Sequence, residues 1–162
     1  NNENITHSYP KYRDGWNIVA KPDGTLIDLD TNRELYSLYY ESENKYNYKV
    51  EDEGFVVKGE DTISFLEEKL ALLGLNSKEA EEFIIYWLPE LEKNKYNYIR
   101  FATKEEIERN MSISYSVTPD SEIRILMTYK PLDKEIEVKE QEIKTPQRIG
   151  FTVVEWGGTR IK

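Results

Sequence analysis

The stretch from Gly59 to Asn94, GEDTISFLEEKLALLGLNSKEAEEFIIYWLPELEKN, predicts two helices joined by a tight turn. Asp61 is a candidate cap for the first helix, and Ile63, Leu66, Leu70 and Leu73 recur at the three- and four-residue spacing of one helical face. Gly74 stands where a left-handed residue ends a helix, followed by the apolar residue of a Schellman motif. We therefore expect the first helix to end at about Leu73.

The second helix is predicted to begin at Asn76, which has capping-box spacing to Glu79. Pro89 has no N–H, so we expect a kink or an end near Leu88. The run 83–88 is apolar or aromatic around most of the helix, which predicts cover on more than one side. The expected core face comprises Ala80, Phe83, Ile84, Trp87 and Leu91.

A helical pair of this size does not bury enough apolar surface to offset its loss of conformational entropy, so it needs a sheet to pack against. The flanking segments read as strands and turns. We therefore predict an α+β fold, a mostly antiparallel sheet with the 61–92 helical hairpin on one face, in a single domain over 11–162 after a poorly patterned lead-in, 1–10. The expected strands are 16–20, 25–29, 34–41, 46–50, 55–57, 96–101, 111–117, 122–129, 135–143 and 151–156, with a short helix at 104–109.

The composition narrows the classes of function. The chain has 162 residues and a net charge of -9 without a basic patch, which argues against nucleic acid and anionic membrane surfaces as partners. It has no cysteine, which excludes thiol catalysis and cysteine-ligated zinc, and we expect no cofactor. No apolar run is long enough to span a bilayer. The first residue is Asn, so we expect a mature or excised fragment.

Asp28, Asp30 and Asn32 match the opening of a calcium-binding loop. The match fails further on, because Arg33 stands where glycine is required and Tyr39 where the bidentate glutamate is expected. A turn between two strands is the favoured interpretation.

Catalytic signatures are weak in this chain. His7 is the only histidine and lies in the lead-in, which favours an exposed side chain over a member of a triad. Glu41 and Glu155 are the two carboxylates with aromatic or apolar neighbours, so they are the candidates for a carboxylate-dependent hydrolase acting on glycan or peptidoglycan. The pattern favours a non-enzymatic binding or interaction module over that alternative, because no nucleophile, base and orienting group are matched.

Tyrosine and tryptophan exceed what a core of this size needs, which points to a partly exposed aromatic surface. Alternation places Tyr36 and Tyr40 on one face of their strand. In the strand 96–101, alternation predicts Ile99 and Phe101 as core residues, with the opposite face exposed. A glycan or a protein partner would suit such a surface, although tyrosines are also ordinary cover on a solvent-facing sheet. The residues predicted to converge on one concave surface are Tyr40, Glu41, Tyr96, Tyr98, Arg100 and Trp156.

Six segments of the chain form a distinctive set: YPKYRDGW (9–16), PDGTL (22–26), GFVVKGEDT (54–62), YWLPELEKNKYNYIRF (86–101), MTYKPLD (127–133) and GFTVVEWGG (150–158). Together they resemble a family of uncharacterised bacterial secreted or cell-envelope proteins. The similarity spans most of the chain and departs from the family at Tyr39-Tyr40-Glu41 and in the lead-in. It implies an extracytoplasmic domain, secreted or anchored to the envelope, and it implies no reaction or ligand.

Overall fold

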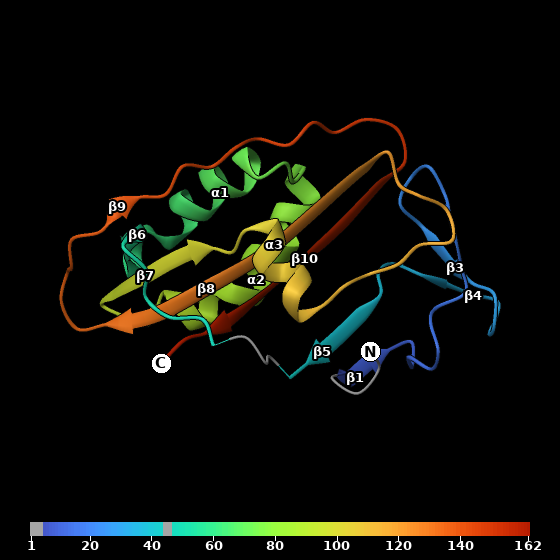
Figure 1. The fold of residues 1–162 in the computed structure, drawn as a ribbon, viewed down its shortest axis with the longest axis horizontal. Helices are drawn as coiled ribbons and strands as arrows, with labels where there is room; N and C mark the ends of the chain where they lie inside the picture. The colour runs from blue at the N-terminus through green and yellow to red at the C-terminus, as the bar shows by residue number, and fades with distance from the viewer. Residues whose placement is uncertain (1–4, 44–46) are drawn as a thin grey trace. The chain divides into compact units, whose positions relative to one another are not determined.

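The computed structural model describes residues 5–43 and 47–162. The chain divides into two compact units, residues 1–45 and 46–162, shown in Figure 1. The expectation of one cooperative domain over 11–162 stays a prediction, because compactness does not measure how a chain unfolds. In the described part of the chain, no helix has the length and apolar character needed to cross a membrane.

The helical hairpin forms as predicted in the second unit. A 3₁₀ turn at Gly59–Asp61 leads into α1 (Thr62–Leu72), although the Asp61 side chain makes no capping hydrogen bond. At the other end Gly74 has φ 93°, its N–H donates to the Ala71 carbonyl, and the N–H of Leu75 donates to the Leu70 carbonyl. These two bonds define the predicted Schellman motif.

Helix α2 (Ser77–Leu91) begins with the predicted capping box, in which Asn76 accepts from the Glu79 N–H at 2.9 Å and donates its own N–H to that side chain at 2.8 Å. The helix continues through Pro89, so it does not end near Leu88, and the alternative of a kink there stays a prediction. The expected core face is correct, since Phe83, Trp87 and Leu91 are buried and Ala80 and Ile84 pack against the core. The prediction that the run 83–88 is covered on more than one side was wrong, because Ile85 is 67% and Tyr86 50% exposed.

The hairpin packs on a five-stranded sheet with the order β10-β8-β7-β6-β9. The pairs β6–β7 and β7–β8 are antiparallel, whereas β8–β10 and β6–β9 are parallel. The predicted α+β class is therefore confirmed. The strands are β6 (Glu53–Lys58), β7 (Tyr96–Phe101), β8 (Ser121–Leu132), β9 (Lys139–Glu140) and β10 (Thr152–Arg160).

Both faces of this sheet are covered, and α3 (Lys104–Asn110) lies on the side opposite α1 and α2 (Figure 1). On the helical-hairpin side, Ile99 and Phe101 pack with the apolar residues of α1 and α2. On the opposite side, Tyr98 and Tyr48 are buried in a second, smaller cluster that includes Leu126 and Leu132. Helix α3 starts with the predicted capping box of Thr103 and Glu106.

Four strand expectations for the second unit differ from the structure. Residues 111–117 form no strand, so β8 pairs with β7 and β10 and not with a preceding hairpin partner. Residues 47–50 form no strand either, and Tyr46 lies outside the described residues. The expected charged edge strand 135–143 is reduced to β9, and β10 continues through Gly157 and Gly158.

The first unit holds two small sheets. A three-stranded antiparallel sheet joins β2 (Ile18–Ala20), β3 (Leu26–Asp28) and β4 (Arg33–Leu35), and the predicted turn between β2 and β3 places Gly24 at φ 89°. A separate antiparallel ribbon pairs β1 (Ile5–Tyr9) with β5 (Tyr39–Ser42). The predicted strand 34–41 is therefore split between two sheets, and part of the expected lead-in is a strand.

Candidate binding surface

One face of the β1–β5 ribbon carries exposed aromatic and hydrogen-bonding side chains. Tyr9 lies opposite Tyr39, and His7 lies opposite Glu41. Side chains two residues apart on a strand share a face, so these four residues lie together. Tyr9 is 53% and Tyr39 45% exposed. We call these four residues the tyrosine face.

Internal contacts hold the two rings of this face in place. The Tyr39 hydroxyl donates to Glu41 Oε1 at 2.9 Å, and the guanidinium carbon of Arg33 lies 5.7 Å from the centre of the Tyr9 ring. A cation within about 6 Å of a tyrosine ring centre is attracted to the face of the ring, which favours one orientation of that ring. The tyrosine face therefore presents oriented rings beside a carboxylate, an imidazole and a guanidinium.

Of the predicted site residues in this unit, Glu41 belongs to the tyrosine face and Tyr40 does not. Tyr40 lies opposite Ser8 in the ribbon, so its side chain is on the other face. Its ring centre is 6.3 Å from that of Trp16, whose Nε1–H donates to the Pro10 carbonyl. Tyr40 and Trp16 thus form part of the packing that supports the ribbon from behind.

The predicted exposed face of β7 is buried. Tyr98 is 0% exposed, its hydroxyl donates to the Glu53 carbonyl at 2.6 Å, and it accepts from the Glu51 N–H at 3.1 Å. Burial raises the pKa of the Tyr98 hydroxyl. The expectation of an exposed tyrosine here was wrong because a second cluster covers this face; Tyr96, at the strand's start, is half-buried.

Arg100 is 7% exposed and forms an ion pair beneath α3. Its Nη1 donates to Glu106 Oε2 at 2.9 Å, while Glu53 lies 3.8 Å from Nη2. Burial by itself would lower the pKa of Arg100, but the hydrogen bond to Glu106 and the nearby charges of Glu106 and Glu53 together outweigh burial and raise that pKa. The guanidinium therefore fixes α3 to the sheet.

Trp156 lies on the helical side of the sheet, opposite to Tyr98 and Arg100. The register pairs it with Ile125, a core residue of the helical side, and its ring centre is 5.3 Å from that of Phe83. Four of the six residues predicted to converge lie in the second unit, and they do not share one surface: Tyr96, Tyr98, Arg100 and Trp156.

The two carboxylates considered for hydrolysis lie in different units, Glu41 in the first and Glu155 in the second. Glu155 accepts a short hydrogen bond from Nε of Arg124 across the β8–β10 pair. Glu41 accepts from Tyr39. Both groups are engaged in internal hydrogen bonds, and a hydrolase function stays a prediction.

The predicted calcium-type segment is a turn held by the first aspartate. Asp28 is buried, and its carboxylate accepts from the Asp30 N–H at 3.1 Å and from the Thr31 hydroxyl at 2.6 Å. Asn32 has φ 55°, which asparagine tolerates in turns. In the described ranges, no three acidic or histidine side chains are grouped as metal ligands.

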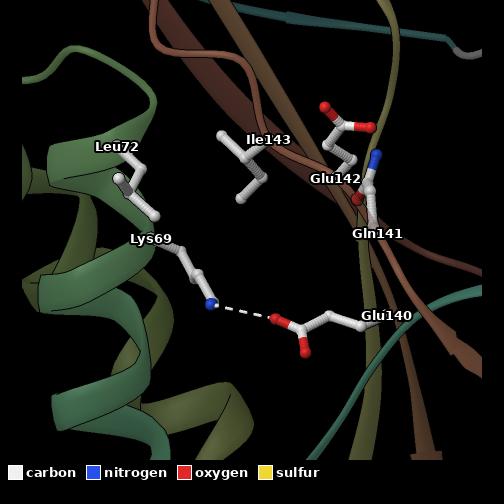
Figure 2. Close-up of a pocket in the computed structure, with 6 residues that line it drawn as sticks. All are labelled: Lys69, Leu72, Glu140, Gln141, Glu142 and Ile143. Carbon is white, nitrogen blue, oxygen red and sulfur yellow. Dashed lines mark hydrogen bonds and ion pairs between the residues drawn. The ribbon is translucent and has the colours of Figure 1, made fainter.

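Two open hollows lie in the second unit. The first, of about 290 Å³, is lined by Lys69, Leu72 and residues 140–143, and Figure 2 shows Lys69 reaching from α1 toward Glu140. Lys69 Nζ is 2.9 Å from Glu68 and 3.5 Å from Glu140, and the hydrogen bond to Glu68 raises the pKa of Lys69. The ion pair with Glu140 joins β9 to α1. The second hollow, of about 490 Å³, is lined by 50–52 and 136–139.

Sequence reasoning missed three members of the tyrosine face, namely His7, Tyr9 and Tyr39. The alternation of Ile5, His7 and Tyr9 with polar residues was a usable strand signal. Pairing with a strand some thirty residues further on has no local signature.

Comparison with known proteins gives no match: no family model, curated protein or solved structure resembles the chain significantly. The resemblance to a bacterial envelope family therefore stays a prediction.

Proposed function

We propose that this protein is a non-enzymatic, extracytoplasmic binding module of the bacterial envelope that binds its ligand through the tyrosine face. The observation that carries the proposal is the pair of half-exposed rings of Tyr9 and Tyr39 on adjacent strands. Tyrosine provides a large contact area with few rotatable bonds, so little entropy is lost on binding.

A glycan fits this surface better than an apolar protein patch does. The groups around the rings are His7, Glu41 and Arg33. Glutamate is depleted in protein interfaces whereas arginine is enriched there, so the preference for a glycan depends on the Glu41 carboxylate. A sugar ring would stack on the tyrosine rings, and its hydroxyl groups would donate hydrogen bonds to the Glu41 carboxylate. A protein ligand remains the alternative that the experiment distinguishes.

Glycan-array binding followed by calorimetry tests the proposal. Tyr9→Ala and Tyr39→Ala should each weaken binding about tenfold or more, as for truncation of an aromatic anchor. Tyr36→Ala is the matched control. Tyr36 is 56% exposed in the same unit and lies outside β1 and β5, the two strands that carry the tyrosine face. Equal loss in all three variants, or no loss in the first two, would contradict the assignment.

A pull-down from envelope extract with the same three variants addresses the protein alternative. A captured protein lost with Tyr9→Ala and Tyr39→Ala and kept with Tyr36→Ala would place a protein partner on the tyrosine face. The extracytoplasmic location is supported by the family resemblance alone, and accessibility of the protein to protease on intact cells tests it.

A further inference from the structure

The two edges of the five-stranded sheet differ in how they are protected. At one edge, β9 is two residues long and both are charged. Next to it, the Gln141 amide donates to the Phe101 carbonyl and accepts from the Phe101 N–H, which satisfies the backbone of β7 beyond its pairing with β6. At the other edge, β10 is nine residues long and has only Glu155 and Arg160 as charged residues. Long, weakly charged edge strands readily pair with another strand.

Alternate residues of β10 direct their backbone groups away from β8. The N–H of Ile161 donates to the Tyr129 carbonyl, and the Phe151 carbonyl accepts from the Ser121 N–H. The odd-numbered residues therefore bond to β8 in the unbroken parallel register. The even-numbered residues present N–H and C=O groups at the edge, and no hydrogen bond joins these to the rest of the described chain: Thr152, Val154, Trp156, Gly158 and Arg160.

We propose that β10 pairs antiparallel with β10 of a second copy of this chain, which forms a symmetric dimer with a continuous sheet. Two-fold symmetry requires a self-complementary strand. Centring the axis on Trp156 meets this requirement, because Val154 then lies opposite Gly158 of the second copy and Glu155 lies opposite Gly157.

Charge and size both suit this register. No like charges stand directly opposite each other, since Arg160 faces Thr152 of the second copy and Glu155 faces a glycine. Each of the two glycines receives a larger side chain from the other copy. The edge residues Thr152, Val154, Trp156, Gly158 and Arg160 then all form hydrogen-bonded pairs, the type in which both residues exchange N–H···O=C bonds.

The flank of α2 extends the same interface. A two-fold axis perpendicular to the sheet places the helical sides of both copies together. Tyr86 is 50% exposed, with its ring centre 6.0 Å from that of Trp156, so it stands beside the strand edge. The dimer would bring the Trp156 and Tyr86 rings of both copies into one aromatic group. A second copy is thus the occupant that matches both the strand and the helix flank.

Disulfide cross-linking tests the register, because the chain has no cysteine of its own. In the proposed dimer, Val153 and Thr159 of the two copies form a non-hydrogen-bonded pair with Cα atoms about 4.5 Å apart, within disulfide range. Within one chain these residues are about 20 Å apart along the strand. Mixing V153C with T159C under mild oxidation should give a covalent dimer, whereas either variant alone should not.

Sedimentation and light scattering test the dimer itself. Tyr86→Lys should raise the dimer dissociation constant about tenfold or more, because it places two like charges near the axis. Ile85→Lys adds the same charge to the neighbouring position, which points to a different side of α2, and should leave the dissociation constant unchanged. A chain that is monomeric at all concentrations overturns the proposal, as does cross-linking by V153C alone. A monomer with slowly exchanging edge amides would also overturn it.

Discussion

Residues 5–43 and residues 47–162 are stabilised in different ways. In the described part of the first unit only Pro10, Asp28 and Leu35 are buried, and its strands are three to five residues long. The second unit has a sheet covered on both faces, with fourteen buried residues in the cluster on its helical side. Local turns and ladders hold the first unit, whereas layered apolar packing holds the second.

The difference shows where a candidate binding surface is found in this chain. In the layered unit Tyr98 and Trp156 are used for packing, while Tyr86 on the flank of α2 stays half exposed. In the first unit, Tyr9 and Tyr39 remain accessible because the β1–β5 ribbon packs on one face and exposes the other. Whether a tyrosine can contact a ligand therefore depends on whether another layer of secondary structure covers it, and not on the residue type.

The largest expected effect is from Trp87→Ala in the layered unit. Trp87 is 9% exposed and packs on Tyr129 with ring centres 5.9 Å apart. Truncation of a core aromatic residue costs about 3–5 kcal/mol. Urea unfolding monitored by circular dichroism should show this loss in the free energy of unfolding. A urea midpoint close to that of the wild type would mean that α2 contributes little to stability.

Gly74→Val should cost about 2–4 kcal/mol, through strain at positive φ and overpacking together. Gly74 has φ 93°, and a Cβ would lie 2.7 Å from Pro146 Cγ. Gly74→Asn is the comparison, because asparagine tolerates positive φ better than valine, whereas its Cβ makes the same close contact with Pro146. Thermal unfolding should rank wild type, Asn and Val in that order.

Glu106→Gln should cost about 1.5–3 kcal/mol at neutral pH by weakening the charged hydrogen bond to Arg100. Burial alone would raise the pKa of Glu106, but the hydrogen bonds from the Thr103 N–H and Arg100 outweigh it and the pKa is lowered. The stability that this gives is present above the ordinary glutamate pKa and is lost as the pH falls through the lowered value. The difference between variant and wild type should shrink on acidification, and a constant difference would contradict the ion pair.

Leu35→Ala should have the smallest effect on the layered unit, below about 0.5 kcal/mol, because Leu35 belongs to the other compact unit and packs within it. Leu66→Ala, at 0% exposure in the large core, is the chemical match and should cost about 2–5 kcal/mol. Amide hydrogen exchange distinguishes the effects on the two units. Leu35→Ala should speed exchange in β2–β4 and leave the exchange rates in β7 and β8 unchanged. Faster exchange in β7 would show that the two units unfold together.

Local chemistry was sufficient to predict the helices from the sequence. The capping boxes of Asn76 with Glu79 and of Thr103 with Glu106, and the Schellman turn at Gly74, each depend on a few adjacent residues. Apolar spacing then identified Phe83, Trp87 and Leu91 as the core face. The strand at 96–101 was equally clear from its alternation.

Tertiary structure alone decided which strand faces are buried and which strands pair. Alternation shows that Tyr98 and Ile99 point to opposite faces, but it does not show that both faces are covered. The parallel pairing of β8 with β10 and the ribbon of β1 with β5 join segments far apart in the chain, and such pairing leaves no trace in neighbouring residues. Short-range hydrogen bonding is encoded locally, whereas burial is a property of the assembled layers, so the sequence located the helices and the fold located the tyrosine face.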